Sequence, residues 1–219
     1  MTMDPIATGV LLAVLGLVPL VLVVATSFAK QLIVFSLLRN ALGAPSVPPT
    51  LVITALAFML SAIVMAPVAQ RMGDTILPML DDPAMAEAPP SEWIAAATDA
   101  SEPWVAFLAA NAGDAEVAAI ARMQDRELDP DAPMPLTVAL PAFTLTELAE
   151  AFQIGFLLFL PFLVLDLLIG SVLLSLGMHM LSPTTVSLPF KLLLFVLVEG
   201  WLILGEALVV GYTYPWVGG

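Results

Sequence analysis

The sequence of 219 residues contains no cysteine, one histidine and six lysine and arginine residues. Without cysteine there can be no disulfide and no thiolate metal site. The single histidine, His179, lacks the partners of a catalytic metal motif, and no glycine-rich phosphate loop or nucleophile elbow is present. We therefore expect neither an enzyme nor a bound metal or cofactor. The shortage of positive charge also argues against a nucleic-acid partner.

Hydrophobic residues make up 60% of the chain, charged residues make up 11%, and the mean hydropathy is +1.02. One soluble core of this size cannot bury so much apolar surface. The formal net charge of −13 comes mostly from residues 74–131, where thirteen acidic residues stand against Arg122 and Arg126. The rest of the chain is nearly neutral. We therefore expect an all-α membrane protein that is interrupted by one acidic, soluble insert.

Four apolar runs have about the length that a membrane-spanning helix needs. The first, Ile6–Ala29, follows an N-terminus without lysine or arginine, so we interpret it as a retained segment and not as a secretory signal. Pro19 is expected to kink this helix. The second run covers Leu51–Val68, and we expect its helix to end near Arg71.

The third and fourth runs follow the insert. The third is apolar from Ile154 to Leu176 except where Pro161 and Asp166 interrupt it, and Thr144–Glu147 before it resembles a capping box that would start its helix. A connector rich in turn-forming residues, Gly177–Pro189, leads to the fourth run at Leu188–Tyr212. We expect each run to form one helix.

These runs predict four long hydrophobic helices arranged as two hairpins, with the acidic insert between the second helix and the third. The expected segments are an N-terminal hairpin at residues 1–72, an extracytoplasmic insert at residues 73–138 and a C-terminal hairpin at residues 139–219. The insert is expected to be partly helical, at Ser101–Ala110 and Asp114–Arg126.

Four charged residues, Asp166, Lys191, Glu199 and Glu206, lie inside the third and fourth runs. Each would cost about 2.5–3.5 kcal/mol near a bilayer centre unless it were paired or hydrated. In a simple hairpin that turns near Ser182, Asp166 and Lys191 are offset by roughly 10 Å along the axis. We hypothesise that the two pair through helix breaks or between subunits. Separate hydration at the membrane interfaces is the alternative.

The connector contains three adjacent residues, Met178, His179 and Met180, in which flexible thioethers flank one imidazole. Such side chains suit a soft constriction that conforms to varied cargo and closes again. Ordinary packing at a helix end explains the same cluster, and the residues by themselves favour that explanation.

Two blocks of sequence carry a resemblance to a known family. The first block comprises Thr26–Lys30, Leu37–Gly43, Pro48–Pro49 and Val64–Pro67. The second comprises Leu140–Phe143, Ala151–Phe156, Leu160–Phe162, Asp166–Leu167, Ser182–Lys191 and Val198–Trp201. In both blocks the chain resembles the SctR/FliP component of the type III secretion and flagellar export gate, and Leu140–Leu148 is similar to the virulence branch. The acidic insert lies outside the resemblance.

The resemblance implies an all-helical core subunit that forms a homopentamer around a path for unfolded secreted proteins. The implied partners are the small S and T components and the larger export-gate and switch proteins of the same apparatus. The implied place is the bacterial inner membrane at the centre of the secretion-system base, with the hydrophobic hairpins held largely on the periplasmic side.

The resemblance also implies roles for particular residues. The family has a methionine-rich ring in the export path, which makes Met178, His179 and Met180 candidate constriction residues. A further methionine is usual at the position of His179, and protonation of the imidazole would make the constriction sensitive to pH. Asp166 and Lys191 are implied as an intramembrane pair. The other polar groups expected to be buried are Glu199, Arg39, Asn40 and Lys30.

Two further interpretations remain open. In a small ion channel or secondary transporter, Asp166, Glu199 and Glu206 would form a proton or cation relay, although the chain lacks the inverted repeats of many transporters. A purely structural membrane scaffold is the third interpretation.

Overall fold

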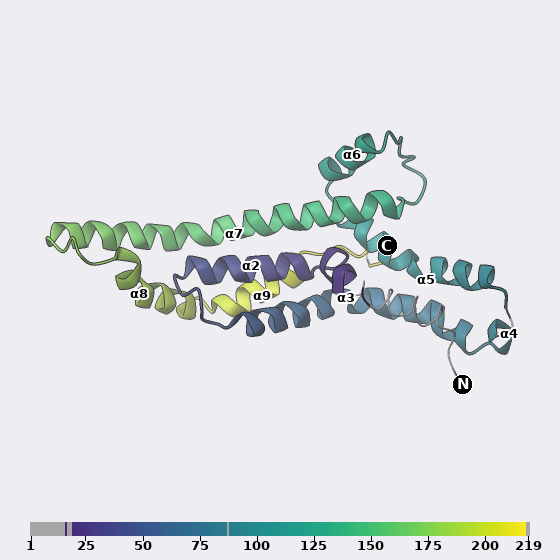
Figure 1. Ribbon diagram of the computed structural model, residues 1–219, viewed down its shortest axis with the longest axis horizontal. Helices are drawn as coiled ribbons and strands as arrows, with labels where there is room; N and C mark the ends of the chain where they lie inside the picture. The colour runs from purple at the N-terminus through teal and green to yellow at the C-terminus, as the bar shows by residue number, and fades with distance from the viewer. Residues whose placement is uncertain (1–15, 17–18, 87, 218–219) are drawn as a thin grey trace.

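The structure, a computed structural model, describes residues 16, 19–86 and 88–217. In chain order its helices are α2 (Phe28–Ala41), α3 (Thr50–Leu80), α4 (Pro83–Ala86), α5 (Pro90–Ala110), α6 (Asp114–Met123), α7 (Leu136–Ser175), α8 (Pro183–Leu197) and α9 (Gly200–Val210). Figure 1 shows an elongated body in which α2 and α9 lie between α7 and α3, while α6 projects to one side. No strand occurs among the described residues, so the all-α prediction is confirmed.

Half of the predicted helix at Ile6–Ala29, including the residue that precedes Pro19, lies outside the described residues. Residues 19–24 are helical, but the chain then bends, and α2 begins only at Phe28. The predicted end of the first helix at Ala29 is therefore wrong, because the helical segment at residues 19–24 ends before the bend. At the bend, Ser27 is buried and its hydroxyl donates to Ser61 Oγ of α3 at 3.2 Å, which gives this polar group a partner inside the apolar core.

Helix α3 is longer than the sequence predicts, because it passes Arg71 and continues to Leu80 with Pro67 and Pro78 inside it. A proline inside a helix removes one backbone hydrogen bond and costs about 3 kcal/mol. Here Val64 and Val68 are buried in a cluster with residues of α5 and α7, and this packing holds the helix together. The predicted end near Arg71 is wrong, and the expected boundary at residues 72 and 73 falls inside α3.

Helix α7 begins at Leu136, directly after Pro135, and has 40 residues. At 1.5 Å per residue its length is about 60 Å, roughly twice the thickness of the hydrocarbon layer. The predicted capping box is wrong, because Thr144–Glu147 lies in the third and fourth turns of this helix. Thr144 Oγ1 donates to the carbonyl of Leu140 inside the helix at 2.8 Å. The expected boundary at residues 138 and 139 also falls inside α7.

The acidic insert forms α5 and α6. Helix α6 ends at Met123, close to its predicted end, whereas α5 begins at Pro90, well before the predicted start at Ser101. The insert packs on the apolar helices through one core cluster, whose fully or nearly buried members are Val64, Val68, Phe107, Leu108, Ala139, Phe143 and Tyr212. The apolar side chains of α5 thus share a core with α3 and α7.

The fourth run is two helices and not one, because α8 and α9 meet at an angle of 59°. Glu199, at the break, has φ 52° and ψ 40°, a left-handed conformation. A Cβ atom on the next residue, Gly200, would lie 2.1 Å from the Phe195 ring, so glycine allows α9 to turn close to the end of α8. The prediction of a single helix at Leu188–Tyr212 is wrong for this reason.

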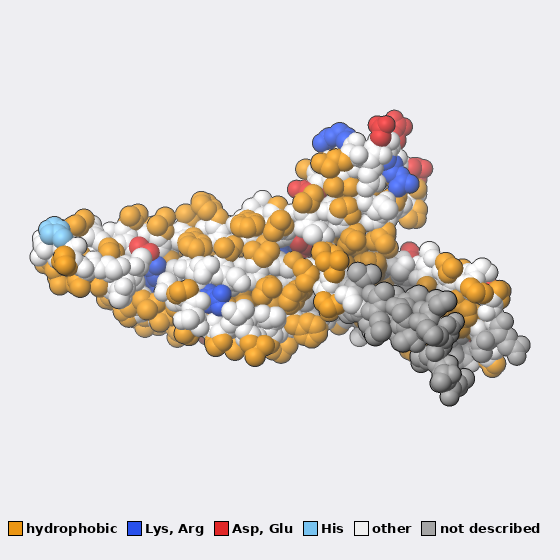
Figure 2. Space-filling view, in the orientation of Figure 1, with side chains coloured by type: hydrophobic (Ala, Val, Ile, Leu, Met, Phe, Trp, Pro, Cys, Tyr) orange, Lys and Arg blue, Asp and Glu red, His pale blue; other side chains and the backbone are white. Residues whose placement is uncertain are grey.

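Two helices, α3 and α7, are long and apolar enough to cross a membrane, and the bent α8–α9 pair meets the same criterion if its two parts form one broken span. The α5–α6 pair also meets it but bends by 112°. Figure 2 shows hydrophobic side chains along the whole elongated body, and charged side chains over the projecting α6. Lipid or other protein chains must cover an exposed apolar surface of this extent.

Candidate functional site

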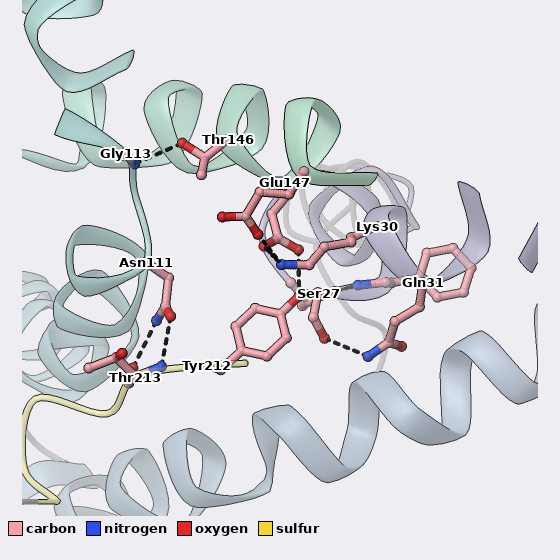
Figure 3. A network of polar contacts seen from close by, with 12 residues as sticks. Ser27, Lys30, Gln31, Asn111, Gly113, Thr146, Glu147, Tyr212 and Thr213 are labelled. Carbon is pink, nitrogen blue, oxygen red and sulfur yellow. Dashed lines mark hydrogen bonds and ion pairs between the residues drawn. The ribbon is translucent and has the colours of Figure 1, made fainter. Parts of the chain in front are cut away.

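A buried lysine, Lys30, joins α2 to α7 (Figure 3). Lys30 Nζ lies 2.7 Å from Glu147 Oε1 and 2.7 Å from Glu150 Oε2. Tyr212, from the C-terminal segment, donates its phenolic hydrogen to Glu147 Oε2 at 2.6 Å. Its ring centroid lies 4.3 Å from Lys30 Nζ. We name these four residues the Lys30 cluster.

The Lys30 cluster contains one positive charge and two negative charges in unequal surroundings. The side chains of Lys30 and Glu147 are 7% and 2% exposed, whereas that of Glu150 is 48% exposed. Burial, together with the Glu147 carboxylate, raises the pKa of the Tyr212 phenol above its ordinary value. The phenol therefore stays protonated and stabilises Glu147, whose carboxylate is the group least accessible to water.

The C-terminal segment also joins the acidic insert to the body. Asn111, at the end of α5, exchanges two hydrogen bonds of 2.8 Å with the backbone of Thr213 (Figure 3). Tyr214 donates to the carbonyl of Val64 in α3 at 2.8 Å. The ring centroid of Phe107 in α5 lies 5.8 Å from that of Tyr212. These contacts position the Tyr212 hydroxyl over Glu147.

The sequence predicts that Lys30 is buried, but it does not predict the roles of Glu147, Glu150 and Tyr212. A signal for the carboxylates was present: a lysine in an apolar stretch requires an acidic partner. Outside the insert the acidic residues of the chain are few, namely Asp4, Glu147, Glu150, Asp166, Glu199 and Glu206. The capping-box interpretation of Thr144–Glu147 assigned Glu147 to the start of a helix, whereas it lies inside α7.

A second buried lysine lies where α2, α7 and α8 meet. Lys191 Nζ lies 2.7 Å from Asp166 Oδ2 and donates to the carbonyl of Ala41, the last residue of α2, at 3.1 Å. Ser187 donates to the other oxygen of Asp166. The side chains of Lys191 and Asp166 are 3% and 21% exposed. We name Lys191, Asp166, Ser187 and the Ala41 carbonyl the Lys191 cluster.

The structure brings Asp166 and Lys191 together within one chain, across the break between α7 and α8, and no second subunit is involved. Helix α7 ends at Ser175 and α8 begins at Pro183, so the two residues lie nine and eight residues from the ends of their helices. Their depths are therefore about equal, roughly 13 Å and 12 Å. The predicted axial offset is wrong, because it counted the connector residues 176–182 as helix.

The three residues Met178, His179 and Met180, which we name the methionine tip, lie in the α7–α8 connector at one end of the molecule (Figure 1). Figure 2 shows the histidine at this end. Gly177 has φ 75°, a conformation that favours glycine, and it turns the chain after α7. Met180 is 98% exposed and Met178 is 43% exposed. Packing within its own chain therefore does not account for Met180.

The remaining predicted polar residues differ in burial. Lys30 is buried, and Arg39 is half-buried with its Nη1 donating to Thr50 Oγ1 at 3.0 Å. Asn40 and Glu199, which we expected to be buried, are exposed on this chain. Asn40 lies next to the end of α2, and Glu199 lies at the break between α8 and α9. Burial of either side chain requires a second molecule.

The carboxylates that an ion relay would need are separate in this chain. Asp166 is paired with Lys191, whereas Glu199 and Glu206 form no ion pair within the part of the chain that the structure describes. Over the same residues, no group of three or more histidine and acidic side chains is arranged to hold a metal ion.

Comparison with known proteins assigns the chain to a family. The sequence model of the FliP family matches residues 11–208. The flagellar biosynthetic protein FliP of Pectobacterium carotovorum is 43% identical over 204 residues, which are 92% of this chain and 76% of that protein. The Yop proteins translocation protein R of Yersinia pestis is 41% identical over 218 residues, 95% of this chain and 97% of that protein. The virulence protein YscR of Salmonella typhimurium is 41% identical over 198 residues, 87% of this chain and 89% of that protein. The chain therefore belongs to the FliP family.

Proposed function

We propose that this chain is a core subunit of a type III protein-export gate in a bacterial inner membrane. In this proposal several copies, five by the family resemblance, surround a conduit for unfolded secreted proteins. The relatives support the assignment to an export apparatus, because they include flagellar biosynthetic proteins and a Yop translocation protein. The extent of exposed apolar surface on α7 and α8 supports an assembly in which lipid and other chains cover each subunit.

The observation that carries the proposal is the exposure of the methionine tip. A thioether that is 98% exposed has no packing role in its own chain, and yet Met180 is held at the end of a long helical hairpin. Copies arranged around an axis would bring their tips together as a ring. Flexible thioethers in such a ring can adapt to the varied side chains of a passing substrate. They can then close the conduit when no substrate is present.

The Lys191 cluster positions this hairpin. It joins α7 to α8 about two turns from the connector and ties both helices to the end of α2. A hairpin fixed in this way projects the tip at a defined place. In our proposal Asp166 and Lys191 are thus positioning residues for the constriction and do not form an ion path.

His179 adds a titratable group to the proposed ring. Protonated imidazoles from several copies would repel one another in a narrow constriction, so the closed state would weaken at acidic pH. Conductance of the purified gate between about pH 5.5 and pH 8, compared with that of His179→Met, tests this part of the proposal. Equal pH dependence of the two proteins would contradict it.

The proposed partners are the small S and T components, the larger export-gate and switch proteins, membrane lipid and unfolded substrates. The proposed position is the periplasmic side of the membrane at the centre of the secretion base. We favour the virulence branch because of Leu140–Leu148, while relatives of both branches match at 43% and 41% identity. Expressing this chain in a strain that lacks the flagellar relative, and in one that lacks the virulence relative, would decide between the branches according to which strain regains secretion.

Native mass spectrometry of the detergent-extracted complex, after co-expression with the other small gate components, tests the assembly. The proposal expects a complex that contains five copies of this chain together with those components. A monomer or dimer without partners would contradict it and would favour the transporter interpretation.

A further inference from the structure

The backbone at the end of α7 is fixed by two hydrogen bonds directly before the methionine tip. The Gly177 amide donates to the carbonyl of Leu174 at 3.0 Å, and the Met178 amide donates to that of Leu173 at 2.9 Å. This pair of bonds is a Schellman motif, in which a glycine with positive φ closes the helix. The chain therefore enters the methionine tip in a defined direction.

The methionine tip itself forms one β-turn. The Leu181 amide donates to the carbonyl of Met178 at 3.4 Å, which makes the three tip residues the first three positions of the turn. The Cα atoms of the first and fourth residues of such a turn lie within about 7 Å of each other. All three side chains are exposed, and methionine side chains are long and flexible. Two thioether sulfurs and one imidazole can therefore reach a common point from a single compact turn.

The donor atoms of the tip are soft or intermediate in character, and all are uncharged when the imidazole is neutral. Residues 167–190 contain no aspartate, glutamate, lysine or arginine, so the sequence around the tip supplies no carboxylate. Thioether sulfur prefers Cu(I) and imidazole also binds copper, whereas Mg²⁺, Ca²⁺ and Mn²⁺ prefer carboxylate and carbonyl oxygen. A donor set without negative charge suits a monovalent ion, because nothing offsets a second positive charge.

Zinc does not fit this donor set. Protein sites for zinc use three or four thiolate, imidazole or carboxylate ligands. The chain has no cysteine and only one histidine, so a single tip offers zinc one suitable ligand. The absence of cysteine also means that no thiolate elsewhere in the chain competes for a soft ion.

We propose that the methionine tip binds a soft monovalent metal ion, Cu(I) or the chemically similar Ag(I). The ligands are the sulfur atoms of Met178 and Met180 and one ring nitrogen of His179. Each ligand atom donates a lone pair to the ion, and no group is oxidised or reduced. In the proposed ring, ions shared between the tips of neighbouring copies hold the constriction closed. This closure rests on the proposed function, whereas binding itself requires one tip only.

Equilibrium dialysis of silver(I) against the detergent-extracted complex, in chloride-free buffer, tests the site. Met178→Leu combined with Met180→Leu keeps the apolar volume of the tip but removes both sulfur ligands. Silver binding should weaken by about a hundredfold, because even residues that only support a metal ligand contribute 10–100-fold to affinity. His179→Gln should weaken it by about tenfold.

Met59→Leu combined with Met123→Leu is the matched control. These two methionines are also exposed, at 56% and 79%, but lie in α3 and α6 and have no histidine beside them. Silver affinity should be unchanged in this variant. Equal silver affinity in the unaltered chain and in the double variant of the tip would overturn the inference. Displacement of the silver by an equal concentration of zinc would also overturn it.

Conductance and mass separate the metal site from the proposed conduit. Silver should lower the conductance of the purified gate, and this loss should disappear in the double variant of the tip. A five-copy complex whose tips bind no silver overturns only the metal site. A chain that stays monomeric but binds silver through its tip keeps the site and overturns the proposed conduit.

Discussion

Lys191 Nζ donates a hydrogen bond of 3.1 Å to the carbonyl oxygen of Ala41, the last residue of α2. Carbonyl groups at the end of a helix have no partner inside the helix and carry partial negative charge, so the ammonium group satisfies one of them. At the other end of α2, Lys30 pairs with Glu147 of α7. Helix α2 is thus fixed to α7 at both ends, and the contact at Lys191 also holds α8.

Asp166→Asn should destabilise the chain more than Lys191→Met. The first change leaves a nearly fully buried ammonium without its counter-charge, at a cost of about 3–5 kcal/mol. The second leaves Asp166, whose side chain is 21% exposed and still accepts the Ser187 hydroxyl, at a cost of about 1–3 kcal/mol. Denaturant unfolding in detergent measures both. The double variant should lose less than the sum of the two, and strict additivity would contradict a coupled pair.

Lys30→Met should cost about 3–5 kcal/mol of unfolding free energy, because it leaves the buried Glu147 carboxylate without a cation. Glu150→Gln is the matched comparison and should cost about 0–1 kcal/mol, since Glu150 is half exposed to solvent. Thermal melting of the two purified variants distinguishes them. Similar losses in both would show that burial of Glu147 does not determine the strength of the Lys30 cluster.

Gly155→Ala tests the close contact between α2 and α7. A Cβ atom at Gly155 would lie 2.2 Å from Leu37 Cδ1 and 3.2 Å from Leu37 Cβ and Cγ. We expect a loss of about 1–3 kcal/mol from this overpacking. Gly73→Ala in α3 is the control, because nothing lies within 4 Å of its added Cβ, and it should gain about 0.5–1 kcal/mol. Leu37→Ala should relieve the effect at Gly155. An unchanged loss in that background would exclude Leu37 as its cause.

Alkaline pH should weaken the Lys30 cluster through Tyr212. The pKa of this phenol is raised in the folded chain above its unfolded value near 10. The protonated Tyr212 phenol therefore contributes its full share to the stability of the folded chain below about pH 10, and this share is lost as the pH rises further. Tyr212→Phe should lower stability at pH 7 by about 1 kcal/mol but should show a flatter decline above about pH 10. Melting curves from pH 7 to values above about pH 10 test this, and identical slopes of the two proteins above about pH 10 would contradict it.

Local signals predicted α6 well. Gly113 precedes it, Asp114 and Glu116 lie in its first turn and Arg122 lies in its last, and all of these favour one short helix there. Local signals do not predict the length of α3. Pro67 is a local signal to stop, and the packing of Val64 and Val68 on α5 that overrides it depends on contacts distant in sequence.

The candidate site shows the same limit. Charges in apolar runs correctly directed attention to Asp166 and Lys191, but their equal depth follows from where α7 and α8 end. The partners of Lys30 lie more than a hundred residues away, and Tyr212 reaches them only because the C-terminal segment folds back. The break at Glu199 has a local signal in Gly200, but the length of the mainly apolar run that contains it favours a single helix.

Convergence of the methionine tips in an assembly is the central claim, and a single cysteine tests it most directly. The chain contains no cysteine, so Met180→Cys provides one thiol per copy for a short bismaleimide crosslinker applied to native membranes. Val217→Cys, exposed but distant from the tip, is the control. We expect covalent dimers of this chain with Met180→Cys and none with Val217→Cys. Readily labelled Met180→Cys chains that never crosslink to one another would contradict it.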